Sequence, residues 1–575
     1  MIRVRCSMVL LLGNSPAQPA TGKLRLARQP RASSCPVWRA APALCGLLMA
    51  LCLPAFAGGE LRFVLRSDPK TFDPLQVSDG PSELIRYLTG GVLIRVDRQT
   101  GKPVAGLAES WRMTDGGRTV AFKLRANLKF SDGTPFSAED VVFTIRRMGE
   151  TNLHSPIADS FQQNGKLPLA EATGANEVAV HFNGPPAGVD RLFDQLPIQS
   201  AKSPRKELAV MGPFLLEEHK AGVSVRLRRN PHYWKKDSSG RTLPYLDGMR
   251  IDIQQNRDIE LRRFEQGELN LINVLDVDSF LQLREGHPET VRDGGPSLES
   301  EFLWFNQSNK SPLPAYKKEW FRSQQFRRAI SASIQRADLV RLVYKGLAEP
   351  AAGPVSSADP VWFNPSLKAQ TYDPNGALQR LKQDGFRLDN SRLVDRSGNA
   401  VEFSLVTNAG NKVRARMATL VEQDLAKIGI KLHIVTLDFP SLVERIGRTL
   451  DYEAALLSFV NVDGDPIGQM NVWLSSAEQH AWNPSQKAPE TAWEAEMDRL
   501  MQAQAATIDL RKRKSSFDRV QAIIAEQAPL IYLVHPRVLG AVSPRVRNVS
   551  PAALWPNLLW NADQLDLATE LSRVR

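Results

Sequence analysis

Residues 107–148 read LAESWRMTDGGRTVAFKLRANLKFSDGTPFSAEDVVFTIRRM. The run TVAFKLR (119–125) places apolar side chains at every second position, which predicts a half-buried β-strand. Asp132-Gly133 predicts a tight turn, because Gly accepts a positive φ and Asp can bond to its own backbone. We therefore expect a strand followed by a turn.

A capped helix is expected directly after this turn. Ser137 is followed three residues later by Asp140, as in a capping box. Val141, Ile145 and Met148 then recur at helical spacing and form one apolar stripe. The whole stretch thus predicts a compact β-turn-α unit and carries no nucleophile, metal-ligand pair or phosphate loop.

The same stretch resembles a known family, the family-five extracellular solute-binding proteins, which are the dipeptide, oligopeptide and nickel receptors of ABC importers. The resemblance is carried by LAESW (107–111), a short turn, a strand and then KFSDGTPFSAEDVVFTI (129–145). Two later stretches are also similar to family patterns, MGPF (211–214) and RNPHYW (229–234). The resemblance covers residues 60–565. It implies an α/β, two-lobe periplasmic binding protein fold (type II) with an additional small subdomain inserted in the first lobe.

Length and composition fit a protein of more than one domain. The chain has 575 residues, of which 42% are hydrophobic, and chains of this size usually divide into several cores. Short strand patterns alternate with helical patterns, which favours an α/β architecture. Guided by the resemblance, we expect a signal peptide at 1–57, lobe I at 58–274 with its subdomain at about 95–208, lobe II at 275–530, and a return to lobe I at 531–575.

The clearest βαβ pattern lies in the second lobe. EFSLV (402–406) predicts a strand and 413–428 predicts a helix that ends at Gly429, after which alternation predicts the next strand. A helix at 440–449, a strand at 452–459 and one long amphipathic helix at about 490–527 are expected to follow.

The N-terminus has the pattern of an export signal. ALCGLLMALCLPAFA (43–57) is a short apolar run behind Arg39 and ends in Ala-Phe-Ala, which predicts cleavage after Ala57 and a periplasmic protein. A lipoprotein anchor is not expected, because leucines precede both Cys45 and Cys52. The basic stretch ahead of this signal is unusually long, and one hypothesis places the true start just before Trp38.

Removal of the signal peptide changes the charge. Residues 1–57 hold seven basic residues and no acidic one, so the formal net charge of +11 falls to +4. A nucleic-acid partner is therefore not expected. The one dense basic run, at 511–514, is interpreted as a solvated helix face.

Neither catalysis nor a bound metal is expected. All four cysteines lie within the first 52 residues, so the mature chain offers no thiolate, and the eight histidines form no close ligand-type pair. No nucleophile elbow, zinc-protease motif or phosphate loop occurs. The sequence thus predicts a binding protein without catalytic residues, metal or cofactor.

The resemblance points to 456–473, LLSFVNVDGDPIGQMNVW, for ligand binding. In peptide-binding relatives an aspartate four positions before a proline pairs with the ammonium group of the ligand. Here that position is Val462, flanked by Asn461 and Asp463, and Asp465 directly precedes Pro466. Asp463, Asn461 and Asp465 are therefore candidate ligand-binding residues. The alternative is that Asp-Gly-Asp-Pro is turn chemistry only.

Three further candidate residues come from apolar segments. The strand pattern EFLWFNQS (301–308) carries Trp304 and Asn306, and relatives have a similar apolar run ending in Asn close to the cleft. Trp473 belongs to a group with Trp482 and Trp493 that could stack on a ligand. Packing in the core is the alternative for all of these side chains.

Together these patterns predict the substrate-binding receptor of an ABC importer, which captures a small ligand between its lobes. The resemblance implies a peptide as the ligand and a permease pair with cytoplasmic ATPases as partners, and we expect a monomer. Alternatives are a receptor for an oligosaccharide, metal chelate or opine, or a periplasmic sensor or enzyme without a transport role.

Overall fold

The computed structural model describes residues 58–150, 152–153, 155–162, 166–204, 208–459 and 464–568. The predicted signal peptide at 1–57 lies outside the described residues. So do the candidates Asn461 and Asp463.

A four-stranded sheet opens the described chain. Its order is β1 (Glu60–Leu65), β10 (Gly248–Ile253), β9 (Ser224–Arg229) and β8 (Phe214–Lys220), and β1 runs parallel to β10. Leu61 and Phe63 alternate into a core that they share with Leu84 and Leu88 of helix α1 (Gly80–Thr89). The loop between β1 and α1 therefore leaves the edge of a well-packed layer.

A second, antiparallel sheet contains the stretch 107–148. Its order is β4 (Ala108–Thr114), β5 (Thr119–Leu124), β7 (Glu177–His181) and β6 (Leu169–Gly174). The predicted strand, turn and helix are confirmed: Gly133 has a φ of 88°, and Ser137 and Asp140 form the capping box of helix α2 (Ala138–Met148). Val141, Ile145 and Met148 pack into the core of this sheet.

The third sheet spans the second half of the chain, in the order β11-β20-β13-β19-β17-β18. Its strands are β11 (Leu271–Ile272), β20 (Leu530–Val542), β13 (Ser300–Phe305), β19 (Ala454–Phe459), β17 (Glu402–Asn408) and β18 (Lys431–Leu437), while β12 (Val291–Pro296) and β14 (Ala348–Pro350) also pair with β20. β17 and β18 are parallel and joined by α11 (Lys412–Ala426), after which Gly429 adopts a φ of 79°. The predicted βαβ unit is confirmed.

Helices and short strands complete these layers. They are β2 (Ile94–Val96), β3 (Pro103–Ala105), η1 (Asp115–Gly117), α3 (Pro156–Phe161), α4 (Val189–Gln195), α5 (Arg257–Glu265), α6 (Val277–Gly286), α7 (Ala315–Arg322), α8 (Gln324–Ser333), α9 (Arg336–Asp338), η3 (Leu339–Val343), α10 (Pro374–Gln383), β15 (Arg387–Asp389), β16 (Arg392–Val394), α12 (Phe439–Glu444), η4 (Arg445–Thr449), η5 (Pro466–Gln469), α13 (Met470–Trp473), β21 (Val546–Arg547) and β22 (Asp566–Leu567).

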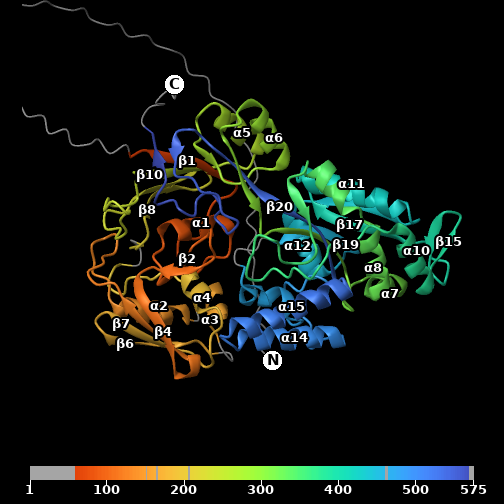
Figure 1. The fold of residues 1–575 in the computed structure, drawn as a ribbon, viewed down its shortest axis with the longest axis horizontal. Coiled ribbons are helices and arrows are strands. Elements are labelled where there is room, and N and C mark those ends of the chain that lie inside the picture. The colour runs from red at the N-terminus through yellow and green to blue at the C-terminus, as the bar shows by residue number, and fades with distance from the viewer. Residues whose placement is uncertain are drawn as a thin grey trace, which may run out of the picture. The chain divides into compact units, whose positions relative to one another are not determined.

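The single helix predicted at 490–527 is wrong. The chain forms α14 (Ala492–Ala505) and α15 (Leu510–Gln527), which lie side by side (Figure 1). The Asp509 carboxylate accepts the backbone N–H groups of Arg511 and Lys512 at 2.9 and 3.2 Å and so starts the second helix. Two packed helices bury more apolar surface than one long exposed helix would.

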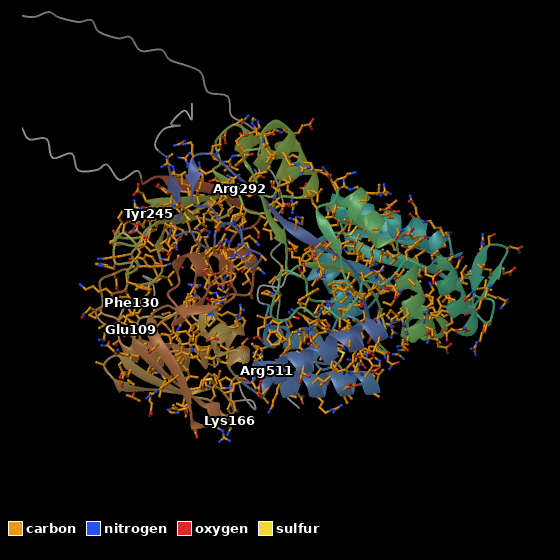
Figure 2. The ribbon with its side chains drawn as sticks, viewed as in Figure 1. Glu109, Phe130, Lys166, Tyr245, Arg292 and Arg511 are labelled. Atoms are coloured by element: carbon orange, nitrogen blue, oxygen red, sulfur yellow. The ribbon has the colours of Figure 1, made fainter. Side chains whose placement is uncertain are left out.

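The basic run at the start of α15 is only partly solvated. Arg511, labelled in Figure 2, and Lys512 are exposed. Arg513 is 4% exposed, and its guanidinium pairs with the Asp465 carboxylate. The interpretation of 511–514 as a solvated face is therefore wrong for Arg513, because helical periodicity turns this residue inward.

Trp482 and His480 lie in a polar network around a buried carboxylate. Glu494, 2% exposed, accepts hydrogen bonds from Trp482 Nε1 at 3.0 Å, Gln486 Nε2 at 2.8 Å and Thr491 Oγ1 at 2.8 Å. His480 Nε2 lies 3.3 Å away. Burial acts to raise the pKa of Glu494, but the bonds from His480, Gln486, Thr491 and Trp482 outweigh it and lower the pKa to about 2.

The Glu494→Gln variant should be destabilised by about 2–4 kcal/mol at neutral pH, because an amide group would face donors that now bind a carboxylate. Because the folded pKa of about 2 lies below the unfolded value of 4.5, the stabilisation is present above that unfolded value and is lost as the pH falls toward 2. The gap between wild type and variant, measured by urea denaturation, should therefore shrink on acidification. Glu496→Gln on the same helix serves as control, because Glu496 pairs with Arg519 at the surface. Equal losses in both variants would contradict this prediction.

Candidate functional site

A cavity of about 620 Å³ lies between segments of the two predicted lobes. The first predicted lobe contributes residues from 74–98, 156–160 and 191–197, which we treat as one wall. The second contributes residues from 468–479, which we treat as the other wall, and Trp555 also lines the cavity. We call it the cleft. Its volume is within the range of about 300–1,000 Å³ that is typical of ligand sites.

The first wall is positioned by the loop between β1 and α1. The Asp73 carboxylate accepts a hydrogen bond from Arg147 at 3.1 Å and one from the Leu75 N–H at 3.1 Å. Burial acts to raise the pKa of Asp73, but these bonds prevail and the pKa lies below its usual value. Asp79 ends the loop as the N-cap of α1 and accepts the Ser82 N–H at 3.0 Å. The loop is thus held at both ends.

Four arginines line this wall, which we call the arginine wall. They are Arg86 on α1, Arg95 on β2, Arg98 in the following turn and Arg191 on α4. Arg86 is bound to Glu83, with Nε at 2.6 Å from the carboxylate, and to the Gln195 carbonyl. Arg191 donates to the Gly101 carbonyl at 3.2 Å.

Asp194, at the end of α4, binds the other two arginines of this wall, Arg95 and Arg98. Its carboxylate accepts from Arg98 at 2.7 Å, from Arg95 at 3.4 Å and from the Val96 N–H at 3.0 Å. Burial acts to raise the pKa of Asp194, and the charges of Arg98 and Arg95 outweigh it, so that the pKa lies below its ordinary value. The carboxylate is therefore ionised and fixes β2 against α4.

The opposite wall, which we call the amide wall, carries no charged side chain and is rich in amide groups. Gln469, Asn471 and Gln479 contribute to it, and Asn471 Nδ2 donates to Gln479 Oε1 at 2.8 Å. Amide groups offer both donors and acceptors, which suits uncharged polar parts of a ligand. The cleft thus combines a charged wall with a neutral hydrogen-bonding wall.

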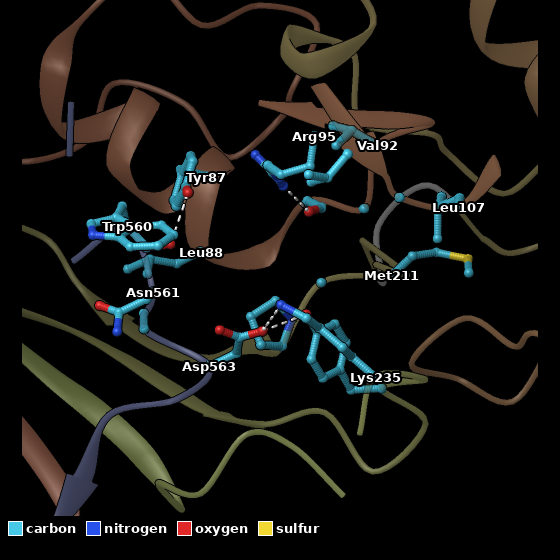
Figure 3. Close-up of a pocket in the computed structure, with 18 of the residues that line it drawn as sticks. Tyr87, Leu88, Val92, Arg95, Leu107, Met211, Lys235, Trp560, Asn561 and Asp563 are labelled. Atoms are coloured by element: carbon cyan, nitrogen blue, oxygen red, sulfur yellow. Dashed lines mark hydrogen bonds and ion pairs between the residues drawn. The ribbon is translucent and has the colours of Figure 1, made fainter. Parts of the chain in front are cut away.

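A smaller cavity of about 200 Å³ adjoins the cleft and shares Tyr87, Val92 and Arg95 with it. We call it the side chamber. Figure 3 shows Tyr87 and Arg95 on one side of it and the Lys235–Asp563 ion pair on the other. The Tyr87 hydroxyl donates to the Trp560 carbonyl at 2.8 Å, and burial raises the pKa of Tyr87.

The predicted site residues fall into two groups. Asn461 and Asp463 lie outside the described residues. Asp465 is 5% exposed, accepts Arg513 Nη1 at 3.0 Å and caps η5 by accepting the Ile467 N–H at 3.0 Å. In this structure Asp465 therefore positions the chain that leads to the amide wall.

Trp304, Asn306 and Trp473 are also enclosed by protein. Trp304 donates to the Tyr452 hydroxyl at 3.0 Å, and Asn306 donates to the carbonyls of Leu450 and Tyr452 at 2.8 and 2.9 Å. Trp473 donates to Oε1 of Gln469 at 3.0 Å and so supports a residue of the cleft. Their exposures are 2% or less, and a direct contact of these side chains with a ligand stays a prediction.

Sequence reasoning missed the arginine wall. The signal lay in RYLTGGVLIRVDR (86–98), where three arginines flank an apolar run shortly after the Asp- and Pro-rich loop. Within the described ranges, no group of three or more His, Cys, Asp or Glu side chains is arranged to hold a metal ion. The same ranges contain no helix long and apolar enough to cross a membrane.

Known proteins share this fold over most of the chain. A probable ABC transporter-binding protein of Deinococcus radiodurans is 26% identical over 85% of this chain and 89% of its own length. The oligopeptide-binding protein AppA of Bacillus subtilis is 25% identical over 83% of this chain and 86% of its own. The structure of this AppA with a nonapeptide superposes with a TM-score of 0.69 at 23% identity, covering 89% of this chain and 99% of that one.

A further solved structure, NikA from Brucella suis with Fe(III)-EDTA, superposes with a TM-score of 0.73 at 19% identity, covering 88% of this chain and all of its own. The family model of bacterial extracellular solute-binding proteins, family 5, matches residues 102–481. The match includes the capped helix unit, the third sheet up to β19, and the amide wall of the cleft. The chain belongs to the family 5 bacterial extracellular solute-binding proteins.

Proposed function

We propose that this protein is the receptor of an ABC importer that captures a peptide in the cleft. Membership of family 5 carries the proposal, together with the similarity to the oligopeptide-binding protein AppA. The cleft supports it, because its neutral amides can hydrogen-bond to a peptide backbone whatever the side chains are.

Delivery of the ligand to the membrane permease requires that ligand binding change the conformation of the receptor. A permease pair driven by cytoplasmic ATPases must distinguish the loaded receptor from the empty one. A ligand that contacts both walls of the cleft binds best when the walls approach each other, and only such differential binding shifts the population. The proposed receptor acts as an exported monomer, with lobes at 58–274 and 275–530 and without catalysis.

The ligand class can be tested by thermal shift of the mature protein. We expect short peptides to raise the melting temperature, since a ligand at 100 times its dissociation constant stabilises by about 2.7 kcal/mol. Oligosaccharides, opines and nickel–histidine complexes serve as comparison ligands in the same screen. The absence of a shift with every peptide at millimolar concentration would contradict the peptide proposal.

A metal chelate is the second candidate ligand. The relative NikA from Brucella suis holds Fe(III)-EDTA, and the arginine wall is suited to the carboxylates of a chelate. A rise in melting temperature with chelates and none with peptides would favour a metal chelate as the ligand.

Asp463 is proposed as the partner of a ligand ammonium group, by resemblance to peptide-binding relatives. The Asp463→Asn variant should weaken binding of free-amine peptides by about 10-fold or more, because a charged hydrogen bond is lost, and should leave N-acetylated peptides almost unaffected. Asp389→Asn, on the exposed strand β15, is the matched control in calorimetric titrations. Equal losses for both kinds of peptide would show that Asp463 is not the amine partner.

We also infer that the mature chain begins at Gly58 and carries no lipid. N-terminal sequencing of the exported protein should read Gly-Gly-Glu-Leu, and its mass should match the unmodified polypeptide. A different first residue or an added acyl mass would contradict this inference.

A further inference from the structure

The arginine wall holds more arginines than carboxylates. Four arginines and three carboxylates (Asp79, Glu83 and Asp194) line the cleft. Asp79 is engaged at the N-terminus of α1, and Glu83 is bound to Arg86. The remaining carboxylate, Asp194, serves both Arg98 and Arg95. Asp194 thus faces two guanidinium groups with a single carboxylate.

Arg98 is firmly bound within the protein. Its guanidinium donates to Asp194 at 2.7 Å, to the Val96 carbonyl at 3.0 Å and to the Trp555 carbonyl at 2.9 Å. Its side chain is 9% exposed, as is that of Arg86. Neither guanidinium can turn to a ligand without losing several bonds.

Arg95 is held much more weakly. Its contacts with Asp194 and with the Gly90 carbonyl measure 3.4 and 3.3 Å, near the limit for a hydrogen bond, and its side chain is 25% exposed. The guanidinium lies 4.6 Å from the centre of the Tyr87 ring, which orients it without using its N–H donors. Arg95 lines both the cleft and the side chamber, and Figure 3 shows it in the side chamber.

The neighbouring carboxylates have other partners. Asp97, which also lines the side chamber, accepts the backbone N–H groups of Gln99 and Thr100 at 3.1 and 2.8 Å. Across the side chamber, Lys235 is neutralised by Asp563 at 2.9 Å. Arg191, the fourth arginine of the wall, interacts electrostatically with Asp190 and Asp359. A negatively charged ligand group is thus the natural counterpart of Arg95.

We propose that Arg95 recognises a carboxylate of the bound ligand and makes the cleft selective for ligands that carry a negative charge at this point. The inference rests on the proposed function, in which the carboxylate is the C-terminus of a peptide. A guanidinium presents parallel N–H donors that match the two oxygens of a carboxylate, which a lysine cannot reproduce.

The first experiment compares trialanine and pentaalanine, each as free acid and as C-terminal amide, by calorimetric titration. Wild type should bind the acids about 10- to 100-fold more tightly than the amides. Arg95→Gln should abolish this preference and leave the affinity for the amides almost unchanged, while Arg95→Lys should retain part of it. Arg112→Gln, exposed on β4, should behave as wild type.

Equal binding of acid and amide by wild type, or an undiminished preference in Arg95→Gln, would overturn the proposal. If Arg95→Gln does not fold, the proposal is still tested by the preference of wild type for the acids and by the reduction of this preference in Arg95→Lys. If wild type binds no form of either peptide but peptides of other sequence bind, the same acid and amide comparison is made on those. Failure of all peptides contradicts the peptide function and not the role of Arg95.

A second experiment tests Arg95 without any peptide. Acetate, titrated at constant ionic strength with chloride, should raise the melting temperature of wild type and of Arg112→Gln in a saturable manner. The rise should be lost in Arg95→Gln. An equal rise in all three proteins would overturn the assignment of the carboxylate site to Arg95.

Discussion

The buried residue Asn270 joins two of the three larger sheets through its hydrogen bonds. Its N–H donates to the Arg62 carbonyl of β1 at 2.7 Å, and its Oδ1 accepts the Arg62 N–H at 2.8 Å. Its own carbonyl accepts the Ser543 N–H at 2.8 Å, at the end of β20. In a buried setting these groups have no water to replace the partners. The junction therefore fixes the end of β20 against the first sheet.

Strand β20 links this junction to the third sheet through its pairing with other strands. Its thirteen residues pair with β11 and β12 near one end and with β13 and β14 nearer the other. Eleven of the thirteen are buried, and a shift of one residue would turn each side chain to the opposite face. The arginine wall follows the first sheet through α1, and the amide wall follows the third sheet through β19. Both walls of the cleft thus depend on the same strand.

Local signals made part of this fold predictable. The helix at 138–148 begins where Ser137 and Asp140 cap it, and α11 ends before Gly429, because caps and positive φ values are properties of a few adjacent residues. The break between α14 and α15 carries no Gly or Pro, and Asp509 alone marks it. The burial of Arg513 depends on Asp465, which is 48 positions away. The cleft was harder to predict, because it assembles side chains from segments almost 500 residues apart. The sharing of one carboxylate, Asp194, by Arg95 and Arg98 depends on such distant contacts.

In the proposed receptor, the two walls of the cleft have different roles in ligand recognition, and together they would favour closure. Arg95 is already oriented by Tyr87 and Asp194, so that binding a charged group there costs little reorganisation. The amide wall carries no formal charge and loses less hydration when it is covered. A ligand held by Arg95 alone would bind equally well whatever the position of the other wall. Contacts with Gln469, Asn471 or Gln479 add binding energy only when the second wall reaches the ligand. In the proposed mechanism, the charge of Arg95 therefore sets where the ligand is captured, and the amides make capture depend on the approach of the lobes.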